Sequence, residues 1–297
     1  MAAVLGLALS LVACGGASSP AEDDGDDRPL IVATTSVIGD ITAGVAGDEA
    51  RVEVLIPIGV DAHDFSPSAQ QASLIAGADL VIANGLGLEE GLTDVLDAAE
   101  EDGVEVIELA PLIDPIPLQD NTDVLDPHFW MDPLRAGQAA RIVAGAMTDQ
   151  LTGGWETRAE AYVREMEMTD ATVTENLSTV APADRQMVTN HESFGYFGDR
   201  YDFEILGVVI PGGSTLAEPS SAHLADLVEM MEEAGSDVIF AETTEPTALA
   251  EAVTAELGGE AMVVELYTES LGEPGTEAAT LSGMLITNAE RISEALA

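Results

Sequence analysis

The pattern of apolar residues predicts two sets of buried strands that alternate with helices. Short β-branched runs are bounded by turn-forming residues, and most are followed by a stretch with apolar residues at helical spacing. In the first half we expect strands at 30–35, 51–57, 78–85 and 104–110, and in the second half at 185–190, 203–209, 236–242 and 261–266. A helix with a Ser cap is expected at 36–47, after the first strand. This alternation is typical of an α/β fold with mostly parallel sheets and flanking helices.

A long helical stretch separates the two sets of strands. Between 156 and 180, apolar side chains recur at positions 159, 163, 166, 173, 177 and 180. At 1.5 Å per residue such a helix is about 38 Å long, enough to span two small lobes. We therefore expect two Rossmann-like lobes, at 30–152 and 182–297, joined by one long rigid helix within 153–181.

The N-terminus has the features of an export signal. Residues 8–16 read ALSLVACGG, and the apolar run before Cys14 is shorter than the ~20 residues that cross a bilayer. The order Leu-Val-Ala-Cys resembles a bacterial lipoprotein signal, although no Lys or Arg precedes it. We expect 1–14 to be the signal, Cys14 to carry the lipid, and acidic 15–29 to be a flexible tether. The alternative is a buried structural Cys.

The charge balance narrows the range of partners. The chain has 55 Asp and Glu against 9 Lys and Arg, a formal net charge of -46, and all nine cations are Arg. Nucleic acid is therefore excluded as a partner, because phosphate binding requires clustered cations. The acidic surface suits solubility in a salty environment, and its field also raises the local concentration of divalent cations.

Three of the four histidines lie near the ends of predicted strands. His63, His128 and His191 follow the second, fourth and fifth strands, whereas His223 lies on a helical stretch and is not expected to be a ligand. Ligands of open α/β sheets collect outside the carboxyl ends of the strands. Three imidazoles with one carboxylate suit Zn²⁺ or Mn²⁺.

Each ligating imidazole also needs a hydrogen bond to its second ring nitrogen. Four nearby carboxylates are candidates for this role, namely Asp61, Asp64, Asp126 and Glu192. In the turn DPHFWMDP, residues 126–133, we expect Phe129 and Trp130 to anchor the backbone, and Asp126 or Asp132 to orient the His128 ring. The aromatic run 194–197 is expected to line the cleft near His191, and Met230 and Met231 to pack a helix.

Several segments together resemble one protein family, the metal-binding solute-binding proteins of zinc and manganese ABC transporters. They are ATTSVIGDI, GVDAHDFSPS, GADLVIANGLGLE, DPHFWMDP, VTNHESFGYFGDRYDF, AEPSSAHLADLVEMM, DVIFAET and LYTESLG. The resemblance implies that His63, His128 and His191 are metal ligands. The fourth ligand in this family is commonly Asp, and Glu269 stands at that position. Manganese-binding members often have Glu where this chain has His191, so zinc is favoured over manganese.

The resemblance also implies partners and a location. We expect a monomer that is tethered to the outer face of the bacterial cell membrane through Cys14 and delivers its metal to an ABC transporter permease. A zinc hydrolase, with Glu192 or Glu242 as general base, is the alternative from another class. Against it, the chain has no His-Glu-x-x-His element, and a fourth protein ligand would close the position that catalysis needs. A surface adhesin with the same metal-binding fold is a further alternative.

Overall fold

The computed structural model describes residues 27–119, 121–257 and 261–297. Cys14 and most of the predicted tether lie outside these residues. Within the described part of the chain, no helix combines the length and apolarity required to cross a bilayer.

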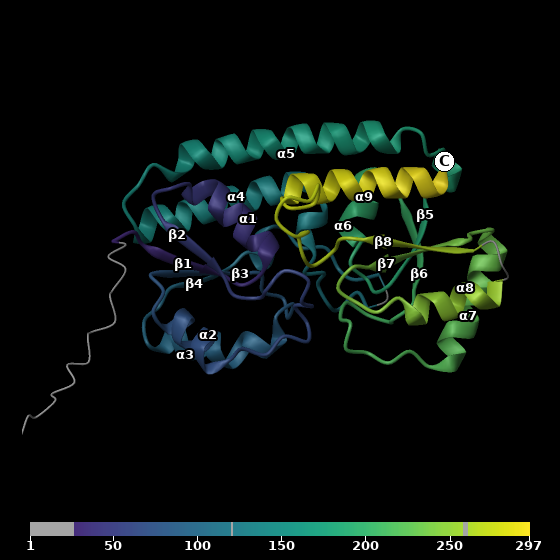
Figure 1. The fold of residues 1–297 in the computed structure, drawn as a ribbon, viewed down its shortest axis with the longest axis horizontal. Helices are drawn as coiled ribbons and strands as arrows, with labels where there is room; N and C mark the ends of the chain where they lie inside the picture. The colour runs from purple at the N-terminus through teal and green to yellow at the C-terminus, as the bar shows by residue number, and fades with distance from the viewer. Residues whose placement is uncertain (1–26, 120, 258–260) are drawn as a thin grey trace, which may run out of the picture.

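The described residues form two sheets of four parallel strands, with helices on both faces of each (Figure 1). The first sheet has the order β2-β1-β3-β4 and the second the order β6-β5-β7-β8. Every strand lies inside the range predicted for it: β1 Leu30–Ala33, β2 Arg51–Val54, β3 Leu80–Ala83, β4 Val106–Glu108, β5 Gln186–Thr189, β6 Glu204–Val208, β7 Val238–Glu242 and β8 Met262–Leu266. The predicted α/β fold with two lobes is therefore confirmed.

The helices cover the sheets in two layers (Figure 1). On one side lie α1 Ser36–Ala46, α4 Pro133–Gln150, α5 Trp155–Leu177, α6 Gly195–Tyr201 and α9 Leu281–Leu296; on the other lie α2 Ala69–Ala76, α3 Thr93–Glu101, α7 Ser221–Ala234 and α8 Ala248–Leu257. The cap of α1 differs from the prediction. Thr35 accepts from the main-chain N–H of Ile38 at 3.2 Å, and Ser36 is the first helical residue.

Helix α5 is the long connector and runs along both lobes (Figure 1). Its 23 residues lie within the predicted range 153–181 and give a length of about 35 Å. Tyr162 donates to Asp40 of α1 at 2.8 Å, and the hydroxyls of Thr169 and Ser282 of α9 lie 2.7 Å apart. These bonds attach α5 to α1 of the first lobe and to the C-terminal helix α9.

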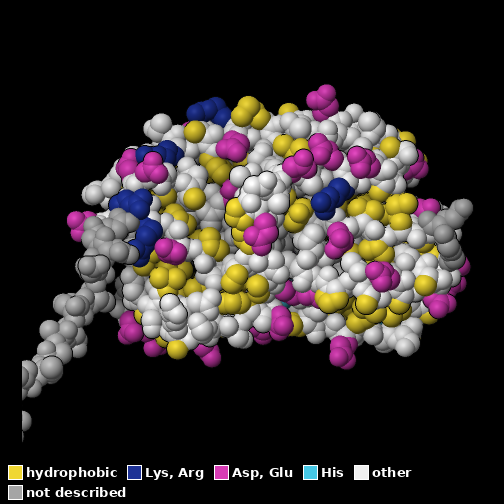
Figure 2. Space-filling view, viewed as in Figure 1, with side chains coloured by type: hydrophobic (Ala, Val, Ile, Leu, Met, Phe, Trp, Pro, Cys, Tyr) yellow, Lys and Arg dark blue, Asp and Glu magenta, His cyan; other side chains and the backbone are white. Residues whose placement is uncertain are grey.

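The carboxyl ends of the two sheets face each other across the lobe boundary. The main-chain N–H of Leu271, beyond β8, donates to Ser36 Oγ, just beyond β1, at 3.0 Å. Parallel strands bring the segments that follow them to one edge of a sheet, where ligands of α/β proteins bind. Acidic side chains are spread over both lobes, and basic ones are few (Figure 2).

Candidate metal centre

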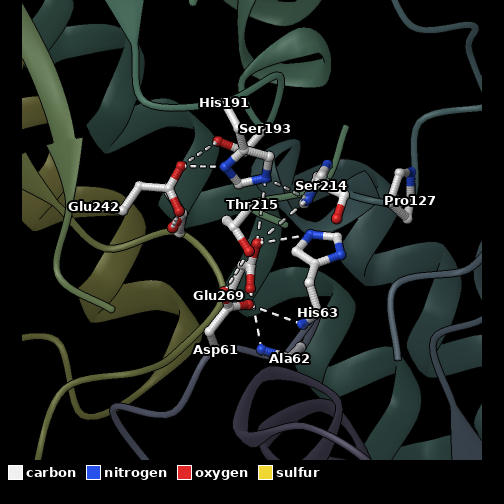
Figure 3. A network of polar contacts seen from close by, with 12 residues as sticks. Asp61, Ala62, His63, Pro127, His191, Ser193, Ser214, Thr215, Glu242 and Glu269 are labelled. Atoms are coloured by element: carbon white, nitrogen blue, oxygen red, sulfur yellow. Dashed lines mark hydrogen bonds and ion pairs between the residues drawn. The ribbon is translucent and has the colours of Figure 1, made fainter. Parts of the chain in front are cut away.

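Four side chains that are distant in sequence meet between the lobes. His63, His128, His191 and Glu269 are all buried, and one donor atom from each lies within 4.8 Å of the others. His63 comes from the segment after β2, His128 from the turn before α4, His191 from the end of β5, and Glu269 from the segment after β8. His63, His191 and Glu269 point toward one another in Figure 3. The structure thus brings together the four residues selected from the sequence.

Several distances between the donor atoms are close to the edge of a small tetrahedron. Glu269 Oε1 lies 3.0 Å from His63 Nε2, 3.3 Å from His191 Nε2 and 3.8 Å from His128 Nε2. The Nε2 atoms of His128 and His191 are 3.2 Å apart. Zinc bonds of about 2.0–2.1 Å give a tetrahedral edge of about 3.3–3.4 Å. Three of the four distances, 3.0, 3.2 and 3.3 Å, are close to that edge, and the His128–Glu269 distance of 3.8 Å is longer.

Two of these atoms show that the side chains converge on a common point. His63 Nε2 and Glu269 Oε1 are buried and 3.0 Å apart, yet neither makes a hydrogen bond. Buried polar atoms are normally hydrogen bonded, so each such exception requires a reason. Atoms that point at a shared centre, rather than along a hydrogen-bond direction, are the arrangement that a metal ion needs.

The local sequence fixes His128 in place. Asp126 Oδ1 accepts both from the main-chain N–H of His128 at 2.9 Å and from its ring Nδ1 at 2.8 Å. Phe129 and Trp130 are buried in a single 3₁₀ turn, and the Trp130 indole donates to the carbonyl of Thr268 at 2.7 Å. Asp126 therefore orients the ring. Asp132 instead caps α4, where it accepts from the N–H of Leu134 at 2.8 Å.

His191 is oriented by a residue that was proposed from the sequence only as a general base. Its Nδ1 contacts Glu242 Oε1, at the end of β7. Glu242 also accepts from Thr268 at 2.9 Å and from Ser193 at 3.4 Å. The sequence signal for this role is the position of Glu242 at a strand end, in the segment DVIFAET.

The other predicted orienting residues have different contacts. Asp61 accepts from the main-chain N–H of His63 at 2.8 Å, and Glu192 accepts from the main-chain N–H of Gln119 at 2.8 Å. Asp64 is exposed. Asp61 also bonds to Thr215 of the opposite lobe (Figure 3). Asp61 and Glu192 thus bond to the main chain, and Asp61 also joins the two lobes.

Three further predictions concern Phe194, His223 and the pair Met230 and Met231. Phe194 lines a cavity of about 170 Å³ beside Asp126 and Glu192, as expected for a wall of the cleft. His223 lies on α7, and its Nε2 is 2.8 Å from the carbonyl of Val208. Met231 is buried, but Met230 is 38% exposed, so only Met231 packs as fully as expected.

Burial and charge shift the titration of the clustered groups. Burial lowers the pKa of His128 and of His191, but the carboxylates outweigh it: Asp126 raises the pKa of His128, and Glu242 raises that of His191 well above its usual value. Burial raises the pKa of Glu269, yet the imidazoles outweigh it and hold that pKa well below its usual range. Burial, and then repulsion by Glu269, raises the pKa of Asp61 to about 8.

Comparison with known proteins identifies the family. The model of the family described as zinc-uptake complex component A, periplasmic (ZnuA), matches residues 31–295. The manganese-binding lipoprotein MntA of Halalkalibacterium halodurans is 27% identical over 290 residues, which cover 97% of this chain and 94% of that protein. The zinc-binding protein TroA of Treponema pallidum is 29% identical over 286 residues, which cover 92% of this chain and 90% of TroA.

Solved structures agree with this assignment. The periplasmic zinc-binding protein TroA of Treponema pallidum matches with a TM-score of 0.83 and 28% identity, over 91% of this chain and 99% of TroA. A manganese-bound mutant of a periplasmic metal-binding protein from Candidatus Liberibacter asiaticus matches with a TM-score of 0.81 and 26% identity, over 91% of this chain and 100% of that one. The chain therefore belongs to the ZnuA family.

Proposed function

We propose that this protein is the extracytoplasmic substrate-binding component of an ABC importer. It captures a divalent transition metal between its lobes, with zinc favoured over manganese, and delivers it to a membrane permease. The observation that carries the proposal is the buried cluster of His63, His128, His191 and Glu269, whose donor atoms all lie within 4.8 Å of one another. The metal is the cargo.

The donor set favours zinc. Three nitrogens and one oxygen suit zinc, whereas manganese prefers more oxygen ligands. Only Glu269 Oε1 faces the imidazoles, because Oε2 accepts from the main-chain N–H of Ala62 at 3.2 Å. A carboxylate held by that bond offers one oxygen to the metal. Relatives are named for both metals, so this preference rests on the chain's own residues.

Transport is favoured over hydrolysis by the same geometry. Four protein donors fill a tetrahedral shell, whereas a catalytic zinc keeps one position for water. The two carboxylates considered as general bases have other partners: Glu242 contacts His191 and Thr268, and Glu192 accepts from Gln119.

We infer that the protein acts as a monomer attached to the membrane through a lipid on Cys14. Lipoproteins among its relatives support the lipid attachment.

Replacement of single ligands tests the proposal. His63→Ala, His128→Ala and His191→Ala should each lower Zn²⁺ affinity by orders of magnitude in competition with a chelator. His223→Ala is the matched control, since His223 lies on α7, bonds to the main-chain carbonyl of Val208 at the end of β6, and should leave affinity unchanged. Equal affinity in the three ligand variants and the wild type would refute the assignment. Competition among Zn²⁺, Mn²⁺ and Fe²⁺ tests the choice of metal.

A further inference from the structure

Glu242 is a buried carboxylate that contacts two of the segments that carry the clustered residues. It is the last residue of β7, and its side chain is 1% exposed to solvent. One oxygen contacts His191 Nδ1, and the other accepts from the hydroxyl of Thr268 at 2.9 Å. Thr268 directly precedes Glu269. Glu242 is thus in contact with the proposed ligand His191, and its other partner, Thr268, is the sequence neighbour of the proposed ligand Glu269.

Thr268 connects Glu242 to the opposite lobe. Its hydroxyl donates to Glu242, and its carbonyl accepts from the Trp130 indole at 2.7 Å. The Trp130 ring lies with its centroid 5.4 Å from that of His128. Thr268 is fully buried, so water cannot replace either bond. Contacts therefore run without interruption from His191 through Glu242 and Thr268 to Trp130, beside His128.

We propose that Glu242 is a positioning residue of the metal site, which holds His191 directly and Glu269 through the hydroxyl of Thr268. This inference rests on the proposed function. A carboxylate on Nδ1 fixes the tautomer and the rotation of an imidazole, so that Nε2 presents its lone pair to the metal. The bond to Thr268 fixes the start of the segment from which Glu269 reaches the same point.

The two oxygens of Glu242 have different partners, so their roles can be separated by mutation. Thr268→Val keeps the shape of the side chain and removes only its hydroxyl. Loss of an outer hydrogen bond to a metal ligand typically lowers affinity about 10–100-fold, and we expect Thr268→Val to fall near the lower end of that range. Thr268→Ser keeps the hydroxyl and should bind as the wild type does. Glu242→Ala removes both contacts and should reach the upper end.

The test is a competition titration of Zn²⁺ against a chromophoric chelator, with the full chain. Thr42→Val is the matched control, because Thr42 is fully buried on α1 and its hydroxyl has no hydrogen-bond partner among the residues that the structure describes. Thr268→Val should bind Zn²⁺ about tenfold more weakly than Thr42→Val. Equal affinity of these two variants would overturn the proposal. A wild type that binds none of Zn²⁺, Mn²⁺ and Fe²⁺ would instead overturn the proposed function.

A double-mutant cycle separates positioning from a general loss of stability. If Thr268 acts through Glu242, adding Thr268→Val to Glu242→Ala should change affinity by less than about twofold, since partners in one network are not additive. A full tenfold effect in that background would contradict the relay. Co²⁺ absorption gives a second readout: Thr268→Val should alter the ligand-field bands, and Thr42→Val should not. If Glu242→Ala does not fold, Glu242→Gln replaces it in the cycle.

Discussion

Gly195 makes room for the carboxylate that orients His128, and Gly195→Ala should therefore weaken metal binding without touching a ligand. Gly195 is the first residue of α6, and a Cβ placed there would lie 2.5 Å from Asp126 Oδ2. Ordinary contact begins near 3.4 Å, so the carboxylate would have to move by about 0.9 Å. Its other oxygen holds His128 Nδ1 at 2.8 Å, and N–H···O bonds weaken beyond about 3.2 Å.

The expected cost follows from these contacts. Overpacking of a buried position typically costs about 1–3 kcal/mol. Alanine is a better helix former than glycine by about 0.5–1 kcal/mol, which offsets part of that cost. The net loss of stability should therefore lie between about 0 and about 2.5 kcal/mol. The larger effect is on binding, because loss of the bond that orients a ligating imidazole lowers affinity about 10–100-fold.

Chelator competition and thermal unfolding measure the two effects separately. Gly145→Ala on α4 is the control, because a Cβ there has no neighbour within 4 Å. It should leave Zn²⁺ affinity unchanged and the fold equally or more stable. Adding Gly195→Ala to Asp126→Ala should cost little further affinity, since the clash is with Asp126 itself. Wild-type affinity in Gly195→Ala would refute the role assigned to Asp126.

Two further predictions concern solution conditions. Because the pKa values of His128 and His191 are raised, Zn²⁺ affinity should fall with decreasing pH from above about 6.5, as protons compete for the rings. The same protonated rings stabilise the metal-free fold, so the metal-free protein should lose that stability as the pH rises through the raised pKa values. Zn²⁺ affinity, measured by chelator titration, should therefore rise with pH while the thermal stability of the metal-free protein falls. A change of both in the same direction would contradict this. Because the net charge is -46, the thermal midpoint should rise as KCl increases from about 0.1 M to about 1 M and the screening length falls from about 10 Å to about 3 Å. A midpoint that is independent of salt would show that surface repulsion contributes little.

The fold was predictable from the sequence because its signals are local. Runs such as LVIA of β3 are buried at all four positions, and the flanking turn residues mark where each run ends. The long connector was visible because its buried positions recur at helical spacing. The cap of α1 was assigned one residue too late because Thr35 and Ser36 are both good capping residues. Their backbone conformation, which decides between them, is not visible in the sequence.

Only part of the candidate site could be predicted from the sequence. The three imidazoles could be placed near one another because parallel strands end at a common edge, and Glu269 was selected by resemblance to a family. The residue that orients His191 was missed, because Glu242 lies 51 positions away and reaches the ring only through the pairing of β5 with β7. Asp126 was found because it lies two positions before His128. Orientation by a sequence neighbour can be predicted, whereas orientation across a sheet requires the fold.

The two lobes share the proposed ligands equally, and this determines how release can occur. His63 and His128 come from the first lobe, and His191 and Glu269 follow strands of the second. The donor-atom distances His63–Glu269, His128–Glu269 and His128–His191 run between the lobes, so a relative movement of the lobes would change all three. Helix α5 runs along both lobes as one continuous helix. Under the proposed function, release of the metal would require one pair of ligands to move against the other.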